Sequence, residues 1–124
     1  MTDHFARARA DVRRIDKPWG YEIQYGLTER YCGKLLVVQA GEALSLQYHE
    51  QKDETLYLQA GRAEIEIGEV GETTAAEVGP GEAVRIRPGV VHRIRALEDS
   101  VFLEVSTPEV DDVVRLEDRY GRAG

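Results

Sequence analysis

The feature that most constrains the fold is a regular succession of short apolar segments and turn residues. From Tyr21 onward, segments rich in Val, Ile, Leu and Tyr are separated by turns at Gly26, Gly41, Gly61, Gly68, Gly71, Gly79-Pro80-Gly81 and Pro88-Gly89. β-branched and aromatic residues favour strands, and turns at such intervals are typical of an all-β sandwich or barrel. Apolar and charged residues alternate strictly in residues 63–67 and 84–87, so every second side chain is expected to point inward.

The N-terminus follows a different period. Four apolar residues fall at helical spacing there, namely Phe5, Ala8, Val12 and Ile15. Thr2 or Asp3 could cap a helix at this point, so residues 3–14 are predicted to form a short amphipathic helix. Pro18 and Gly20 then end the helical pattern, and the barrel is expected to begin after them.

Length and composition indicate one globular domain. The chain has 124 residues, of which 42% are hydrophobic and 31% charged, enough for a single core and too few for a separate cofactor domain. Residues 108–124 contain apolar positions that could pack as a short strand or helix against the barrel. Cys32 is the only cysteine, so it cannot form an intramolecular disulfide and is expected to be structural.

Charge and hydropathy exclude some partners. The net charge of −7 argues against a general nucleic-acid surface, which needs a basic stripe. Four arginines near His92 are interpreted as a solvated strand face, with a local anionic ligand as the alternative: Arg85, Arg87, Arg93 and Arg95. No apolar run has the length of a signal peptide or a membrane span, so we expect a cytoplasmic protein without membrane contact.

Four polar residues in two separate stretches have the types and spacing of a metal site. Gln47 and His49 are two apart, so in a strand they project to the same side. Glu54 follows a predicted turn and begins the next strand, residues 55–59, which could run back antiparallel beside the first. His92 lies on a distant strand that a barrel would bring alongside. Two imidazoles, a carboxylate and an amide oxygen suit Zn²⁺, Fe²⁺, Mn²⁺, Co²⁺ or Ni²⁺ with an open position.

The spacing of these residues resembles the paired motifs of the cupin superfamily. Residues 41–61 read G-x5-Q-x-H-x4-E-x6-G, and residues 88–92 read P-G-x-x-H. The resemblance implies an all-β double-stranded β-helix, the cupin jelly-roll barrel, here with a short N-terminal helix.

Three further phrases narrow the family. LSLQYH, residues 44–49, resembles the L-S-[LI]-Q-x-H signature of phosphomannose isomerases. KPWGYE, residues 17–22, and VRLEDRYGR, residues 114–122, resemble the opening and closing phrases of the isomerase domain at the C-terminal end of bifunctional mannose-6-phosphate isomerase/mannose-1-phosphate guanylyltransferases. Residues 17–122 are therefore predicted to be a cupin isomerase-like domain without the guanylyltransferase half, and residues 1–16 an N-terminal extension.

The chain departs from that isomerase pattern beside the expected substrate. Three consecutive histidines are usual where this chain has His49-Glu50-Gln51, and a histidine–tryptophan pair is usual where it has Thr55-Leu56. The arginine two residues before the metal glutamate is Lys52, which keeps the positive charge but loses the two-pronged geometry of arginine. These changes leave the identity of the sugar open.

The resemblance implies a metal-dependent isomerase that converts mannose 6-phosphate to fructose 6-phosphate through a cis-enediol. The four residues above would then bind the metal, with Zn²⁺ as the first choice, and a sugar phosphate would be the small-molecule partner. Lys52 is the first candidate for the base or for a phosphate contact, because a nearby dication would depress its pKa. Glu50 is a second candidate, together with the Arg119-Tyr120 region.

Two other functions stay open at this stage. Two histidines and a carboxylate on Fe²⁺ also resemble the facial arrangement of non-haem iron dioxygenases. A non-catalytic sugar or metabolite binder would keep the barrel and the metal but lack a base. Turnover of a substrate separates these functions. Alternating apolar strands with a sheet edge also suggest a homodimer.

Overall fold

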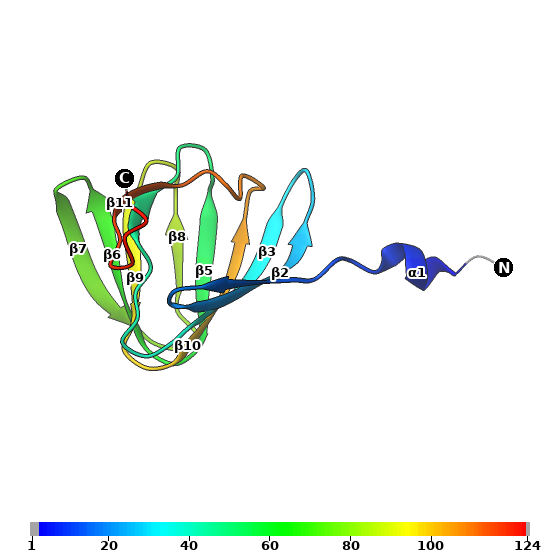
Figure 1. Ribbon diagram of the computed structural model, residues 1–124, viewed down its shortest axis with the longest axis horizontal. Helices are drawn as coiled ribbons and strands as arrows, with labels where there is room; N and C mark the ends of the chain where they lie inside the picture. Colours follow the sequence, from blue (N-terminus) through cyan, green and yellow to red (C-terminus); the bar gives the residue numbers. More distant parts are fainter. Residues whose placement is uncertain (1–2, 124) are drawn as a thin grey trace.

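The computed structural model describes residues 3–123 and consists almost entirely of strands (Figure 1). Its elements are α1 (His4–Ala8), β1 (Arg13–Lys17), β2 (Gly20–Leu27), β3 (Cys32–Val38), β4 (Leu46–Tyr48), β5 (Glu54–Ala60), β6 (Ala63–Glu69), β7 (Glu72–Val78), β8 (Ala83–Ile86), β9 (Val91–Ala96), β10 (Ser100–Ser106) and β11 (Val114–Glu117). The helix α1 is five residues long, too short to reach across a lipid bilayer.

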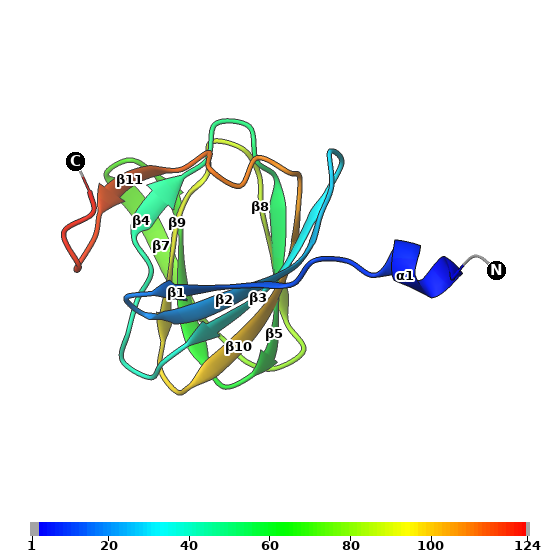
Figure 2. The ribbon, with the colours of Figure 1, turned by 45° about the vertical axis from the view of Figure 1, so that its right-hand side comes forward.

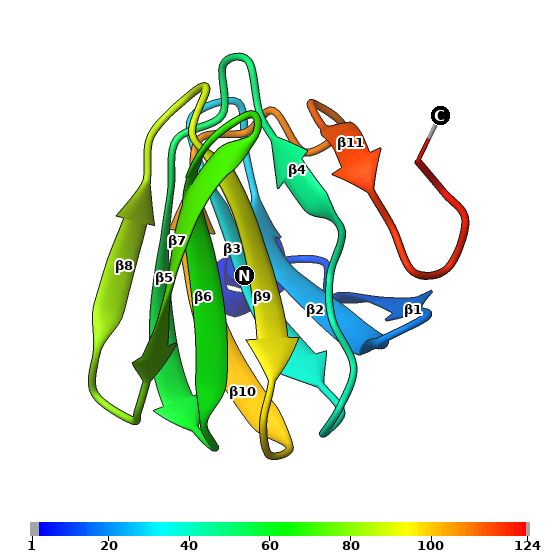
Figure 3. The ribbon, with the colours of Figure 1, turned by 90° about the vertical axis from the view of Figure 1, so that its left-hand side faces the viewer.

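The strands form two antiparallel sheets that face each other. One sheet has the order β1-β2-β3-β10-β5-β8, and the other has the order β11-β4-β9-β6-β7. Figure 2 shows the two sheets curving around a common interior, and Figure 3 shows β11 beside β4 at the sheet edge. This arrangement confirms the predicted all-β jelly-roll barrel with a short N-terminal helix. Of the two structures suggested for the C-terminal segment, the strand is the one observed.

The N-terminal helix is shorter than predicted, and the sheet starts earlier. Asp3 caps α1 by accepting hydrogen bonds from two backbone amides, whereas Thr2 lies outside the described residues. The helix ends at Ala8 instead of residue 14, because all its residues are exposed and burial therefore does not stabilise its apolar stripe. β1 gains ladder hydrogen bonds by pairing with β2, so the expectation that the barrel begins after Gly20 is wrong. β1 crosses the predicted division between residues 1–16 and 17–122.

A tight two-residue turn between β1 and β2 explains why proline, tryptophan and glycine follow one another at residues 18–20. Lys17 pairs with Gly20 across the turn between β1 and β2, and Trp19 inserts into the core with 3% of its surface exposed. Gly20 has a φ of 151°, and a Cβ at this position would lie 2.0 Å from the carbonyl oxygen of Val37. Only glycine therefore lets β2 approach β3 so closely.

The core and the charged interior share the same strands. The apolar cluster comprises Trp19, Leu36, Val38, Leu56, Leu58, Ala63, Ile65, Val78, Ile86, Ile94, Ala96 and Phe102. Burial of a side chain such as Leu56 or Phe102 contributes about 1.5–3 kcal/mol. Strand alternation also turns Glu104 inward, because it lies two residues from Phe102 and both are buried. The strands thus carry apolar and charged residues on one inner face.

Two minor sequence interpretations can be compared with the structure. Cys32 is buried at the start of β3, and burial raises the pKa of its thiol, which disfavours a reactive thiolate. Three of the four arginines near His92 form ion pairs with carboxylates: Arg85 with Asp53, Arg93 with Glu66, and Arg95 with Glu64. Arg85 and Arg95 are about half exposed, in agreement with a solvated strand face, whereas Arg93 is mostly buried and lines the pocket described below.

Candidate metal centre

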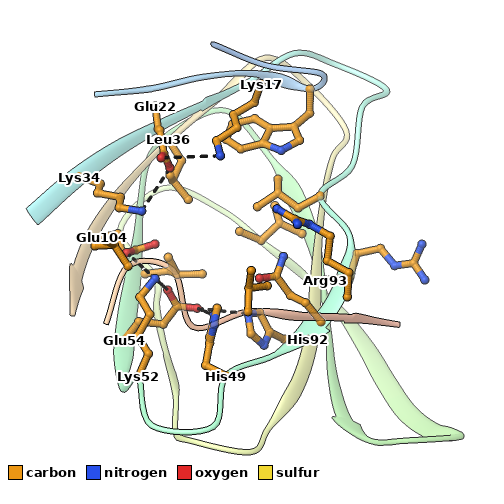
Figure 4. Close-up of a pocket in the computed structure, with 18 of the residues that line it drawn as sticks. Lys17, Glu22, Lys34, Leu36, His49, Lys52, Glu54, His92, Arg93 and Glu104 are labelled. Carbon is orange, nitrogen blue, oxygen red and sulfur yellow. Dashed lines mark hydrogen bonds and ion pairs between the residues drawn. The ribbon is translucent and has the colours of Figure 1, made fainter. Parts of the chain in front are cut away.

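Three buried side chains, His49, Glu54 and His92, meet inside the barrel (Figure 4). His49 directly follows β4, Glu54 is the first residue of β5, and His92 is the second residue of β9. One potential ligand atom from each lies within 4.8 Å of the others. The structure therefore brings together three of the four residues selected from the sequence on the basis of ligand chemistry, from three separate parts of the chain.

Strand pairing explains how distant residues converge. Gln47 of β4 is directly opposite His92 of β9, as expected for strands brought side by side by a jelly roll. The expected antiparallel pairing of β4 with β5 is wrong, because β4 belongs to the five-stranded sheet and β5 to the six-stranded sheet. Glu54 reaches the histidines across the barrel interior, from the opposite sheet. A narrow barrel makes this approach possible without any ladder between the two strands.

The two imidazoles are held with their Nε2 atoms toward one carboxylate oxygen. His49 Nδ1 lies 2.5 Å from the carbonyl oxygen of Asp112, and His92 Nδ1 lies 2.9 Å from that of Val90. A carbonyl can only accept, so each Nδ1 carries a hydrogen, and Nε2 is the ring nitrogen left to face Glu54. Both Nε2 atoms face Oε1 of Glu54, at 3.3 and 3.1 Å.

The contacts of His49, Glu54 and His92 indicate whether a cation fits between these side chains. Two imidazole nitrogens and a carboxylate oxygen this close together need a proton or a cation between them. Backbone carbonyls that hold Nδ1 are the usual outer partners of metal-binding histidines. Two imidazoles and one carboxylate, without a thiolate, suit a borderline divalent metal with an open coordination position. The residues of this site therefore fit a divalent cation.

Gln47, the fourth residue predicted to bind the metal, lines the same pocket. Its amide nitrogen donates a hydrogen bond to the hydroxyl of Ser45 at 2.9 Å. Because the nitrogen is engaged with Ser45, the amide oxygen is the atom that Gln47 can offer to a cation.

Lys52 is buried between two carboxylates and does not lie free beside the site. Its Nζ is 3.1 Å from Oε2 of Glu54 and 3.1 Å from Oε2 of Glu104. Burial lowers the pKa of Lys52, but the charges of Glu104 and Glu54 outweigh it and raise the pKa above its ordinary value. Among these side chains Lys52 is therefore a cation at neutral pH, and the depression expected beside a bound dication stays a prediction.

Glu54 and Glu104 compete for this single ammonium group. Burial opposes ionisation of Glu54, yet its bonds to His49 and His92 and the charge of Lys52 hold its pKa well below the usual range. Burial and the negative charge of Glu54 together raise the pKa of Glu104 to about 7, against the pull of Lys52. Glu54 is thus the carboxylate that ionises first, and Glu104 follows near neutrality.

Asp112 was missed in the sequence and organises the loop before Glu54. Its carboxylate accepts backbone hydrogen bonds from Glu50, Gln51 and Lys52, at 3.1, 2.7 and 3.0 Å. Its carbonyl oxygen contacts His49. These three amides hold the pKa of Asp112 below its usual range. An aspartate in an acidic C-terminal segment gives no sequence signal for this role, because the contact spans some sixty residues of chain.

The other predicted catalytic candidates lie outside the pocket. Glu50 is exposed, and only its backbone amide takes part in the loop anchored by Asp112. Arg119 donates to the carbonyl oxygen of Gly41, and the hydroxyl of Tyr120 donates to the carboxylate of Glu42. Neither of these side chains is among those that line the pocket with His49, Glu54 and His92.

A second charged group lines the same pocket, whose volume is about 110 Å³. Glu22 lies between Lys34 and Lys17, with oxygen–nitrogen distances of 3.4 and 3.9 Å. Figure 4 shows this group on the side of the pocket opposite His49, Glu54 and His92. Apolar side chains such as Leu36, Leu56 and Ile94 also line the pocket. A ligand with polar groups at both ends suits this distribution.

Together, the barrel and its inner histidine-glutamate-histidine cluster define a small jelly-roll protein with a candidate metal centre. The chain belongs to the cupin domain family, whose sequence pattern matches residues 34–106. Its sequence is 36% identical over 114 residues to mannose-1-phosphate guanylyltransferase ManC of Salmonella typhimurium, a match that covers 89% of this chain and 23% of the relative. The chain thus spans about a quarter of the length of the curated relatives it matches.

Solved structures share the fold at lower sequence identity. KdgF from Halomonas sp. superimposes with a TM-score of 0.69 and 24% identity, over 82% of this chain and 90% of that protein. Oxalate decarboxylase from Bacillus subtilis, a protein with Mn(II) centres, superimposes with a TM-score of 0.71 and 22% identity, over 86% of this chain and 30% of that one. These similarities show the cupin fold.

Proposed function

We propose that this protein is a metal-dependent aldose–ketose isomerase that acts on a sugar phosphate, with mannose 6-phosphate as the first candidate substrate. The observation that supports this most is the convergence of His49 and His92 on Oε1 of Glu54, at one end of a pocket with cationic groups at the other. The similarity to ManC over 89% of the chain directs the choice toward mannose phosphates.

In this proposal, Gln47, His49, Glu54 and His92 hold a divalent metal, Zn²⁺ first. A bound metal would stabilise negative charge on the sugar oxygens at carbons 1 and 2 as the cis-enediol forms. The buried ammonium group of Lys52 adds a fixed positive charge beside the same position. Glu104 is an acceptor-only carboxylate when ionised and lines the pocket, so it is the side chain we assign to proton transfer between the two carbons.

Proton NMR in D₂O tests the proposal. Metal-loaded protein is incubated with mannose 6-phosphate, and an enediol route should incorporate deuterium at carbon 2 or carbon 1 of the products. Glu54→Gln should abolish this exchange, whereas Arg95→Met, at an exposed ion pair on the outer surface, should retain it. Binding of sugar phosphates without any exchange would replace the isomerase with a non-catalytic binder. Oxygen consumption with substrate turnover would replace it with a dioxygenase.

We also propose that two copies pair through the outer face of the six-stranded sheet. Neighbouring strands of this sheet present apolar side chains outward: Tyr21, Ile23, Leu35, Val37, Tyr57, Val101, Leu103 and Val105. Val105 is 59% exposed and Tyr57 39% exposed. A contiguous apolar face of this kind marks an interaction surface, and a symmetric pair of identical sheets would cover it.

A further inference from the structure

Arg115 belongs to the same inward-facing row as two residues of the candidate metal centre. In β11 it lies directly opposite Gln47 of β4, and Gln47 lies directly opposite His92 of β9. Directly opposite residues in antiparallel strands project to the same face of the sheet. With about 5 Å between neighbouring strands, the backbone of Arg115 is roughly 10 Å from that of His92. Arg115 accordingly lines the pocket from the sheet edge.

The positive charge of Arg115 is not neutralised by a neighbour. The other basic side chains that line the pocket all face carboxylates: Lys17 and Lys34 face Glu22, Lys52 faces Glu54 and Glu104, Arg93 faces Glu66, and Arg122 faces Asp118. Within residues 3–123, Arg115 has no such ion pair, and its Nε is buried without a hydrogen-bond partner. Buried donors are almost always paired, so this atom lacks an acceptor that a ligand could supply.

Positive charge accumulates around this position. Burial lowers the pKa of Lys17 although Glu22 opposes the change, and the nearby cations Lys34, Arg122 and Arg115 lower it further. An anion placed among these groups would relieve their mutual repulsion. The guanidinium group of arginine can also bind two oxygens of one phosphoryl or carboxylate group at once.

We propose that Arg115 binds the anionic end of the ligand, and that this end is the phosphoryl group of a sugar phosphate. This inference rests on the proposed function for the choice of phosphoryl over carboxylate. The sugar would lie within the pocket, with its carbons 1 and 2 toward His49, Glu54 and His92 and its phosphoryl group at β11. Arg115 is then a binding residue that determines preference for phosphorylated over free sugars.

Isothermal titration calorimetry on the full, Zn²⁺-loaded chain tests this assignment with fructose 6-phosphate, fructose and glucuronate as probes. Arg115→Met keeps the unbranched stem of the side chain but removes the guanidinium group with its charge, and it should weaken binding of fructose 6-phosphate about 10- to 100-fold. Binding of fructose should not change. Arg115→Lys should weaken fructose 6-phosphate binding by a smaller factor, and Arg95→Met, which removes the same charge from the outer surface, should leave it unchanged.

Several outcomes would overturn the assignment. Equal losses for fructose and fructose 6-phosphate, no loss for either, or no binding of fructose 6-phosphate by the unmodified chain would each rule out a phosphoryl site at Arg115. Tighter binding of glucuronate, lost in Arg115→Met, would show a carboxylate site instead. If Arg115→Met does not fold, as judged by circular dichroism, the test rests on Arg115→Lys, which should weaken binding of fructose 6-phosphate without weakening binding of fructose. Arg115-dependent binding of fructose 6-phosphate without isomerisation would refute the proposed function but not this inference.

Discussion

Replacing Glu104 with glutamine should change how the stability of the metal-free protein depends on pH. Glu104 is 3% exposed and shares the ammonium group of Lys52 with Glu54. Burial, followed by the charge of Glu54, raises its pKa from 4.5 to about 7. The folded state therefore binds this proton more tightly than the unfolded state. Its contribution is fully present below about pH 4.5 and is lost as the pH rises through about 7.

The size of this effect follows from the difference between the two pKa values. Each pKa unit corresponds to about 1.4 kcal/mol, so a change from 4.5 to about 7 corresponds to roughly 3 kcal/mol of unfolding free energy. Glutamine has nearly the same shape as glutamate but cannot ionise. The Glu104→Gln variant should therefore not lose this unfolding free energy as the pH rises. The free energy of unfolding of the variant should accordingly rise relative to the native chain by up to about 3 kcal/mol between about pH 5 and about pH 9.

Urea unfolding in the presence of EDTA, followed by circular dichroism at several pH values, measures the difference. Glu98→Gln, at an exposed carboxylate, is the control for the loss of one negative charge and should track the native chain. A difference between Glu104→Gln and the native chain that does not vary with pH would refute the argument. A variant that loses relative stability as the pH rises would show that Lys52 stabilises ionised Glu104 more than burial penalises it.

Three further predictions concern the metal centre, Lys52 and the outer sheet face. His92→Ala should weaken metal binding by more than about 100-fold while the barrel stays folded, as elemental analysis and circular dichroism would show, because the hydrophobic core and not this open site stabilises the fold. Retained metal, or loss of folding, would contradict this. Lys52→Met leaves two buried carboxylates without their cation, so it should lower the free energy of unfolding of the metal-free protein by roughly 3–5 kcal/mol. Under conditions where this variant is folded, turnover should fall far more than metal content, and equal losses would limit Lys52 to a structural role. Val105→Glu places a charge on the apolar outer face and should convert a dimer to a monomer in light scattering, whereas Glu98→Gln should not. A native chain that is already monomeric would refute the proposed pairing.

The sequence alone was sufficient for the fold class and for most of the candidate site. Strict alternation and closely spaced turns permit few structures other than a sandwich or barrel. The two-residue period of a strand is a local property, so it can be recognised directly in the sequence. The same alternation predicted that Gln47 and His49 lie on one face. The resemblance to the cupin motifs then added Glu54 and His92 to the predicted ligands. It also contained a signal that was not used: Glu104 lies two residues from Phe102, so it shares the buried face of β10.

The tertiary structure decided which strands pair and which distant groups meet. β4 and β5 are consecutive strands that look like a hairpin in the sequence, yet they belong to different sheets. The stripe of apolar residues at the N-terminus fits a helix, but strand pairing with β2 takes over at Arg13. Periodicity shows which face of a strand is buried, but not which strand lies opposite, because pairing depends on contacts between residues far apart in the chain. For that reason the loop anchored by Asp112 and the place of Arg115 beside Gln47 emerge only from the folded barrel.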